Sequence, residues 1–321
     1  MRERLYVVVP CYNEEDVLPE TTRRLKAKLG QLMEAERIDP SSKVLYVNDG
    51  SQDRTWELIE EIHREDPLFS GISLSHNRGH QNALLAGLLT AKEYADMVIS
   101  MDADLQDDID VMDEMLRKYQ EGCDVVYGVR SSRRTDAFFK RFSAESFYKL
   151  MGFMGAEIVY NHADCRLTSR RALEALYEYQ ESNLFLRGVF PAIGFRSATV
   201  EYERKERFAG ESKYSLKKMI AFAWEGITSF TAWPLRLIVG LGALMFGVSF
   251  LCLVILTVKK LLGYTVAWWT DVLCSIWLVG GLQLFCLGII GEYIGKIFYE
   301  TKRRPRFIIE KSLLDDEEAL R

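Results

Sequence analysis

Two long apolar runs constrain the fold of this chain more than any other feature. They cover Leu237–Val258 and Val272–Gly291, and neither contains a charged residue. A helix needs about 20 consecutive apolar residues to cross a bilayer core, so each run is long enough. Two buried core helices are the alternative, but such helices usually keep a polar face. We therefore expect a hairpin of two transmembrane helices.

Basic residues flank this predicted hairpin unevenly. The connecting loop carries only Lys259 and Lys260, whereas the outer flanks carry Lys213, Lys217, Lys218, Arg236, Lys296, Lys302, Arg303, Arg304 and Arg306. Loops rich in Lys and Arg stay on the cytoplasmic side. We expect an inner-membrane protein with two spans and both termini in the cytoplasm.

The remaining boundaries follow from the hairpin. Residues 215–230 repeat apolar side chains at helical spacing, which predicts a helix at the membrane surface. An ordinary helix of the soluble domain gives nearly the same pattern. The predicted organisation is a cytoplasmic domain (1–212), an interface helix (213–232), a first span (233–258), an extracytoplasmic loop (259–267), a second span (268–295) and a cytoplasmic tail (296–321).

Composition excludes several other classes of protein. With 48% hydrophobic and 27% charged residues, the chain is neither disordered nor collagen-like. Six scattered cysteines without a Cys-x-x-Cys pair exclude a zinc site or a disulfide framework. The net charge of −5 gives no reason to expect a nucleic-acid partner. The first ten residues lack the pattern of a signal peptide, so we expect the N-terminal part in the cytosol.

The first 212 residues alternate short β-rich runs with longer helical patterns. The predicted strands are Leu5–Val9, Lys43–Asn48, Ile72–Leu74, Met97–Met101 and Asp124–Tyr127. The predicted helices are Glu14–Lys28, Thr55–Arg64, Gln81–Ala91 and Ile109–Gln120. This alternation is typical of βαβ units on a mostly parallel sheet. Ligands of such sheets bind beyond the carboxyl ends of the strands.

Polar residues follow each of the first four predicted strands. The sequences are PCYNEE from Pro10, NDGSQD from Asn48, HNRGHQN from His76 and DADLQ from Asp102. Neither a Gly-x-Gly-x-x-Gly fingerprint nor a Walker loop is present, so carboxylates and amides replace a glycine cradle. Asp102 and Asp104 lie on one face of an extended segment, where a hard divalent ion can take oxygens from them and from a diphosphate. Gln106 can add a carbonyl ligand.

Several ordered motifs resemble the polyprenyl-phosphate branch of family 2 glycosyltransferases, which have the GT-A fold. They are VVPCYNEE from Val8, VNDGSQDRT from Val47, NRGHQNA from Asn77, DADLQ from Asp102, ADCRL from Ala163, Arg187-Gly188, RFAGESKY from Arg207 and GEYIGKIF from Gly291. The resemblance covers nearly the whole chain and includes undecaprenyl-phosphate glucosyltransferases and dolichyl-phosphate mannose synthases. Two positions depart from it: Asp107-Asp108 replace a usual Pro-Pro pair, and Cys165 replaces a common aromatic residue.

The resemblance implies a role for individual residues. The residues implied to bind the nucleotide are Pro10, Tyr12, Asn13, Glu14, Asp49, Gly79, Asp102, Ala103 and Asp104. Of these, Asp49 is implied to accept a hydrogen bond from the uracil edge. The implied catalytic residues are Asp164, Asp102 and Arg187. The residues implied to bind the lipid phosphate or the diphosphate are Arg166, Arg187, Arg207, Ser212 and Lys213. The implied ligands of Mg²⁺ or Mn²⁺ are Asp104, Gln106 and Asp102.

These residues predict an inverting, metal-dependent transfer of one hexose from a UDP-sugar to undecaprenyl phosphate. Glucose is the expected sugar, with N-acetylhexosamine as the alternative. The basic residues before the interface helix fit a lipid phosphate, although general attraction to anionic lipid would also place them there. A processive polysaccharide synthase is disfavoured because Gln-x-x-Arg-Trp is absent. The aspartates argue against a non-catalytic nucleotide-sugar sensor, and a homo-oligomer is possible.

Overall fold

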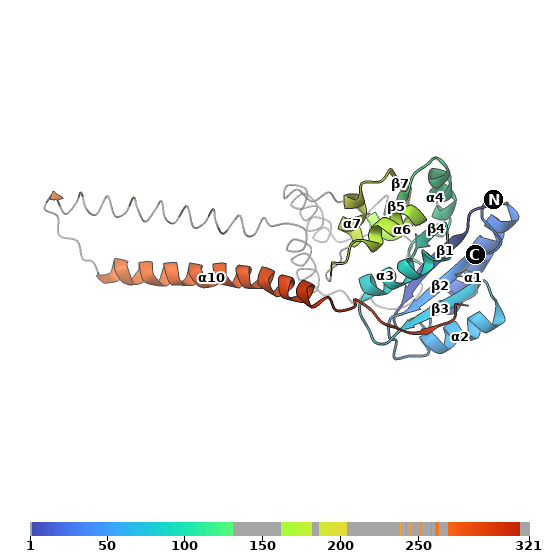
Figure 1. The fold of residues 1–321 in the computed structure, drawn as a ribbon, viewed down its shortest axis with the longest axis horizontal. Coiled ribbons are helices and arrows are strands. Elements are labelled where there is room, and N and C mark those ends of the chain that lie inside the picture. Colours follow the sequence, from blue (N-terminus) through green and yellow to red (C-terminus); the bar gives the residue numbers. More distant parts are fainter. Residues whose placement is uncertain are drawn as a thin grey trace. The chain divides into compact units, whose positions relative to one another are not determined.

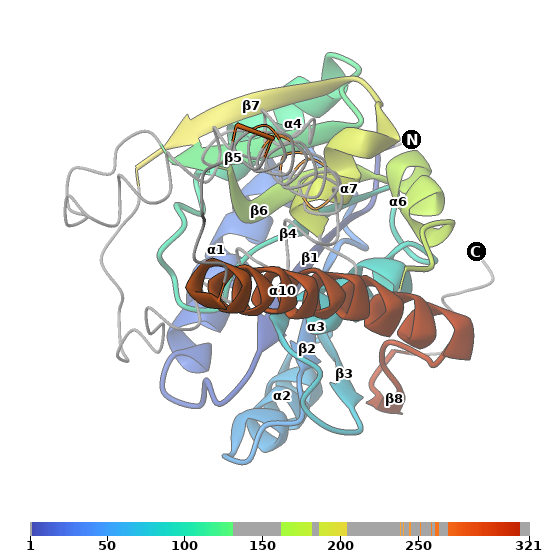
Figure 2. The same cartoon turned by 90° about the vertical axis from the view of Figure 1, so that its left-hand side faces the viewer.

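The computed structural model describes residues 2–130, 162–181, 186–203 and 269–314, with a few separate positions between 238 and 262. These residues belong to two compact units. The first unit contains every described strand, and the second contains one long helix, α10 (Trp269–Lys302). Figure 1 labels α10 and most of the strands, and Figure 2 also labels β6 and β8. The predicted interface helix, Arg207, Ser212 and Lys213 lie outside the described residues, as does most of the predicted first span.

An eight-stranded sheet forms the centre of the first unit. Its strands are β1 (Leu5–Cys11), β2 (Lys43–Asn48), β3 (Phe69–Leu74), β4 (Met97–Ser100), β5 (Val125–Arg130), β6 (His162–Ser169), β7 (Ser197–Tyr202) and β8 (Ile309–Ser312). Their spatial order is β7-β5-β6-β4-β1-β2-β3-β8, so β7 and β8 form the two edges (Figure 2). The five predicted strands are confirmed, four of them with shifted ends and Lys43–Asn48 with the predicted bounds.

The strand directions are mostly parallel, as predicted. Strand β1 pairs in parallel with β2 and β4, β2 with β3, and β5 with β7. Strand β6 is antiparallel to both β4 and β5, and β8 is antiparallel to β3. The sequence analysis did not predict β6, β7 or β8. Strand β8 lies within the predicted cytoplasmic tail.

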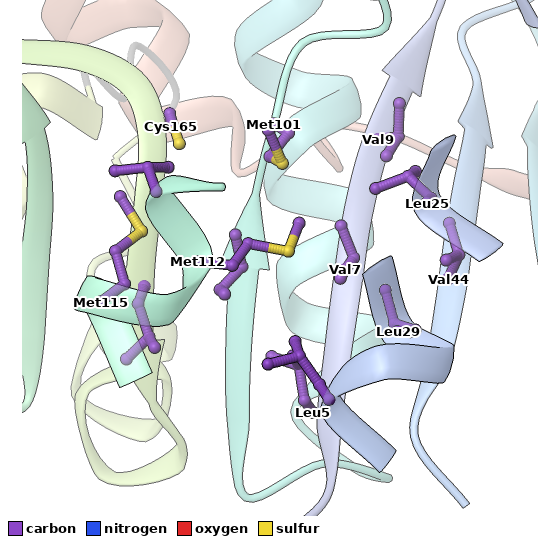
Figure 3. Packing of buried hydrophobic residues seen from close by; sticks show 14 of the residues in the cluster. Leu5, Val7, Val9, Leu25, Leu29, Val44, Met101, Met112, Met115 and Cys165 are labelled. Atoms are coloured by element: carbon purple, nitrogen blue, oxygen red, sulfur yellow. The ribbon is translucent and has the colours of Figure 1, made fainter. Parts of the chain in front are cut away.

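Helices cover both faces of the sheet, and their bounds are α1 (Leu18–Glu34), α2 (Thr55–Glu65), α3 (His80–Ala91), α4 (Val111–Gln120), α6 (Arg170–Tyr177) and α7 (Leu186–Ile193). The first four were predicted. Apolar residues of α1 and α4 share one buried cluster with alternate residues of β1 and β2, such as Val7, Val9 and Val44 (Figure 3). Helix α4 itself lies over β5, β6 and β7. Burying each such side chain contributes about 1.5–3 kcal/mol. This core fixes the strands whose ends carry the polar loops.

Helix α3 lies close against the opposite face of β1 and β2, and Gly87 permits the approach. A Cβ atom at Gly87 would lie 2.4 Å from Val8 Cγ1 and 2.7 Å from Val47 Cγ2. Both distances are shorter than any real contact, so a larger residue would push the helix away from the sheet. Gly87 therefore sets the depth at which α3 presents its first residue, His80, to the sheet edge.

The second predicted span, 268–295, falls on α10, which continues to Lys302. Throughout the part of the chain that the structure describes, no helix combines the length and apolar character required to cross a membrane.

Gly50 provides a test of how the loops after β2 and β3 fit together. Its φ is +63°, and an added Cβ would lie 2.5 Å from the backbone nitrogen of Asn77. We expect Gly50→Ala to lower the free energy of unfolding by at least about 2 kcal/mol, because strain and a backbone clash add up. Thermal unfolding in detergent measures the change.

Gly30 supplies the matched control, because a Cβ there meets nothing within 4 Å. Gly30 lies inside α1, where Gly→Ala is expected to stabilise by about 0.5–1 kcal/mol. An equal response of the two variants would contradict the close fit at Gly50.

Candidate active site

The carboxyl ends of four adjacent parallel strands, β3, β2, β1 and β4, meet at one edge of the sheet. The antiparallel strand β6 begins at that same edge and carries Asp164. The Ser100 hydroxyl donates to the backbone carbonyl of Asp164 at 2.6 Å, which ties β6 to the end of β4. The polar loops thus converge with Asp164, as the strand order requires.

The loops after β1 and β2 interlock through side chain to backbone hydrogen bonds. Asn13 has a φ of +54°, and its Oδ1 accepts from the backbone of Gln52 at 2.8 Å. The backbone N–H of Glu14 donates to Thr55 Oγ1 at 2.9 Å. Tyr12 lies beside them with 38% of its surface exposed. Four of the nine predicted nucleotide residues, Pro10, Tyr12, Asn13 and Glu14, therefore belong to one segment that these hydrogen bonds hold in place.

Asp49 is buried and holds the loop after β3. Its Oδ1 accepts from the backbone N–H of Arg78 at 2.7 Å, and its Oδ2 accepts from that of Gly79 at 2.9 Å. Burial raises the pKa of Asp49 above its ordinary value, although these two hydrogen bonds oppose the shift. The contact with the uracil edge stays a prediction, and the loop-holding role is new.

The Asp102–Gln106 loop is fixed from both ends. The Thr21 hydroxyl donates to the carbonyl of Ala103 at 2.9 Å, and the Gln106 N–H donates to Asp104 Oδ1 at 3.2 Å. Leu105 adopts a φ of +57°, so the chain turns sharply between Asp104 and Gln106. Farther along, the Tyr202 hydroxyl donates to buried Asp107. A buried acceptor for Tyr202 explains one acidic residue where a Pro-Pro pair is usual.

Three side chains, from α7, α3 and the loop after β4, meet around Asp164. Arg187 of α7 donates from Nε to Asp164 Oδ1 and from Nη2 to Oδ2, both at 3.0 Å. The Nε2 atom of His80 lies 3.5 Å from Asp164 Oδ2 and 3.5 Å from Asp102 Oδ1. The structure therefore brings the three predicted catalytic residues, Asp102, Asp164 and Arg187, into one cluster.

The sequence analysis placed His80 in a polar segment after the third predicted strand and gave it no catalytic or metal role. The only sequence signal for its place in the cluster is its position in the polar segment after the third strand. Its ring bridges two carboxylates that are 62 residues apart in the chain, which no sequence pattern predicts.

The pKa values follow from this crowding. Desolvation by itself lowers the pKa of His80, but the bond with Asp164 and the charges of both aspartates raise it to about 9. Burial raises the pKa of Asp102 to about 7; the charge of His80 acts to lower this pKa, and that of Asp164 acts to raise it. Burial also acts to raise the pKa of Asp164, but Arg187 and His80 outweigh it and hold that pKa well below its usual range. Asp164 is therefore an anion at neutral pH.

Arg166 projects from the same face of β6 as Asp164, because side chains alternate along a strand. It is 1% exposed, and its guanidinium lies 4.1 Å from the centre of the Phe190 ring and 5.4 Å from that of Tyr127. Burial lowers the pKa of Arg166 to about 10, so it stays charged at neutral pH. Cys165 points to the opposite face, into the apolar core (Figure 3), away from Asp164.

The donor atoms at this edge suit a hard divalent cation. Asp102, Asp104 and Gln106 offer carboxylate and amide oxygens, which Mg²⁺ and Mn²⁺ accept. One ligand atom each of His80, Asp102 and Asp164 lie within 4.8 Å of one another. The residues present therefore fit a metal, with Asp102 common to both sets.

Comparison with known proteins agrees with this architecture. The family described as Glycosyl transferase family 2 matches residues 6–177. An uncharacterised glycosyltransferase of Bacillus subtilis (strain 168), YkoT, is 52% identical over 98% of this chain and 93% of its own length. A prophage-derived bactoprenol glucosyl transferase of Shigella flexneri is 38% identical over 96% of this chain and 98% of its own. This chain therefore belongs to glycosyltransferase family 2 and is a glycosyltransferase.

Proposed function

We propose that the enzyme transfers one hexose from a UDP-sugar to undecaprenyl phosphate at the cytoplasmic face of the membrane. The observation that carries the proposal is the 38% identity to a bactoprenol glucosyl transferase along almost the full length of both chains. Glucose is the sugar that this relative's name supports, and N-acetylhexosamine is the alternative. The product is a lipid-linked monosaccharide.

The site chemistry supports a phosphate acceptor. A phosphate monoester has a second pKa of about 6, so a lipid monophosphate is largely a dianion at neutral pH and needs little help from a base. Asp164, which is ionised and held by Arg187, then orients the acceptor or the sugar rather than abstracting a proton. Arg187, Arg207 and Lys213 would bind the phosphates, and inversion follows from direct attack on the anomeric carbon.

A divalent metal would be held by Asp102, Asp104 and Gln106. Bound there, it would neutralise charge on the departing diphosphate. The protein's own part is to hold those oxygens in place through the Thr21 and Gln106 hydrogen bonds.

The chain's return to the sheet supports the proposed membrane topology. Strand β8 follows α10 in sequence and pairs with β3, so residues before and after the two apolar runs belong to one sheet. A chain that leaves a domain and returns to it crosses a bilayer an even number of times. The two spans and the cytoplasmic termini stay predictions from the apolar runs and the charge pattern.

The direct test incubates the detergent-purified protein with undecaprenyl phosphate, Mg²⁺ and a panel of UDP-sugars, and follows the lipid fraction by mass spectrometry. A lipid that gains one hexose supports the proposal and names the donor. Long polymer among the products would favour a processive synthase instead. Metal-dependent UDP binding without any product would contradict the acceptor assignment.

Removal of divalent metal is expected to abolish transfer. Carboxylates that no longer share a cation repel the diphosphate, so we expect EDTA to lower the rate by at least about 100-fold, and excess Mg²⁺ or Mn²⁺ to restore it. Full activity in EDTA would contradict the assignment of Asp102, Asp104 and Gln106 as metal ligands. Calcium–EDTA complex provides the control for chelator effects unrelated to free metal.

A further inference from the structure

Arg166 is a buried cation whose hydrogen-bonding capacity is unused. Its Nε, Nη1 and Nη2 atoms are all buried, and within the described residues none of them has a hydrogen-bond partner. A guanidinium carries five N–H donors, and leaving a buried charged group without bonds is costly. The rings of Phe190 and Tyr127 compensate through cation–π contacts and hold the guanidinium in place. Such a costly arrangement needs a reason.

The reason lies in the charges around Asp164. Among the described residues, two arginines act on this one carboxylate, and of these two Arg187 is the one bonded to it. Arg166 lies two residues along the same strand, close enough that the charges of Asp164 and Arg187 both act on it. These three side chains, two arginines and one aspartate, together carry one positive charge in excess. A buried excess charge of this kind favours the arrival of an anion.

Helix α7 connects the two arginines. It supplies both Arg187, which holds Asp164, and Phe190, which covers Arg166, and residues three apart lie on one helix face. The side chain of Arg187 is 25% exposed, whereas that of Asp164 is 10% exposed. A ligand can therefore reach Arg187 more readily than Asp164, and it cannot reach Arg166 in this state.

We propose that Asp164 occupies Arg187 in place of a substrate phosphate, and that Arg166 is the positioning residue that permits the exchange. When a phosphate takes Arg187, Asp164 loses its bonded partner. Arg166, which is fixed between its two rings, then compensates the charge of Asp164 without occupying its oxygens. Asp164 stays ionised, in place and free to orient a substrate.

This inference rests on the proposed function, which supplies two sources of phosphate: the lipid acceptor and the diphosphate of the donor. Their chemistry is the same at Arg187. The test therefore measures two probes by calorimetry in detergent, farnesyl phosphate for the acceptor and UDP with Mn²⁺ for the donor.

Arg166→Met is the main variant, because it removes the charge and keeps most of the volume. We expect it to lower the affinity for at least one probe by about tenfold or more. The affinities of Arg166→Lys are expected to stay within about threefold of the wild type. In an Asp164→Asn background, Arg166→Met is expected to add nothing, because the charge that Arg166 compensates is gone. A residue that only fills space would show the same loss in both backgrounds.

Lys28→Met is the matched control. Lys28 is also a buried cation of this domain, but it lies away from the cluster. It pairs with Asp110, the N-cap of α4, and with Asp113 in the first turn of that helix. We expect Lys28→Met to lower the melting temperature and leave both probes unaffected. Arg166→Met is expected not to lower the melting temperature, since an apolar side chain replaces an unpaired buried charge.

The outcomes separate cleanly. A loss confined to farnesyl phosphate identifies the acceptor as the exchanging group, a loss confined to UDP identifies the donor, and a loss of both indicates a site that takes either. Wild-type affinity of Arg166→Met for both probes, or an equal loss in the Asp164→Asn background, overturns the inference. If Arg166→Met does not fold, a loss of binding in Arg166→Lys, which keeps the charge, overturns it. A wild type that binds the probes but transfers no hexose defeats the proposed function and leaves this inference standing.

Discussion

Asp164→Asn is expected to lower the turnover of sugar transfer by about 10²–10³-fold while UDP affinity stays within about threefold of the wild type. Asparagine keeps the size of the side chain but replaces one carboxylate oxygen with an N–H donor. It can no longer accept from both Arg187 nitrogens, and it brings an amide N–H toward either Arg187 or His80. The cluster then loses the charge that orders it, at the step where the sugar and the acceptor must be aligned.

A radiolabelled transfer assay measures the turnover, and calorimetry with UDP and Mn²⁺ measures the affinity. Asp124→Asn is the matched control, because Asp124 also pairs with an arginine, Arg171. Asp124 directly precedes β5, at the end of the strands opposite to Asp164. We expect that variant to retain nearly full turnover. Turnover near the wild-type value in Asp164→Asn would remove this carboxylate from the catalytic residues.

The sequence predicted the parallel half of the sheet because those strands obey simple rules. Strands β1 to β4 are short, apolar and separated by helical patterns, and each ends in a polar segment that marks the ligand edge. Once the strands are parallel, their polar ends must converge. The sequence alone therefore predicts that the loops after β1, β2 and β3 lie near Asp102.

Strand β6 escaped prediction because its polar face is buried. Asp164, Arg166 and Thr168 alternate with Cys165 and Leu167, which is a strand period, but charged residues in that pattern indicate a solvent-facing strand or a loop. In the structure both faces are covered: Cys165 and Leu167 pack in the core, and Arg166 packs against Phe190. The compensation comes from α7, about 20 residues later in the chain, so local sequence cannot reveal it.

The same limit applies to individual contacts in the site. The family resemblance implied Asp164 and Arg187 separately, but their two-bond ion pair depends on the antiparallel placement of β6. Asp49 shows the same: its motif indicated a nucleotide contact, which stays a prediction, and no motif indicated that its oxygens also hold the backbone of Arg78 and Gly79. Motifs thus locate the residues of a site, and the strand order decides which of them touch.

Asp104 offers the second large effect, and it tests the metal ligands directly. We expect Asp104→Asn to raise the Mn²⁺ concentration for half-maximal UDP binding by about 10–100-fold, with a comparable loss of turnover at fixed Mg²⁺. The amide is neutral and a weaker ligand, although its oxygen can still accept from the Gln106 N–H that shapes the loop. The loop geometry at Leu105 is therefore kept while the negative charge is removed.

Asp108→Asn is the matched control, since Asp108 belongs to the same acidic loop and its Oδ1 accepts from the N–H of Asp110 at the start of α4. Asparagine preserves that acceptor, so metal affinity and turnover are expected to stay within about threefold of the wild type. Calorimetric titration of UDP at a series of Mn²⁺ concentrations distinguishes the two variants. If both shift the Mn²⁺ requirement equally, the loop acts through its total negative charge, and Asp104 is not a specific ligand. If only Asp104→Asn shifts it, and excess Mn²⁺ restores UDP binding, the metal is held by this carboxylate, as the Asp-x-Asp spacing predicts.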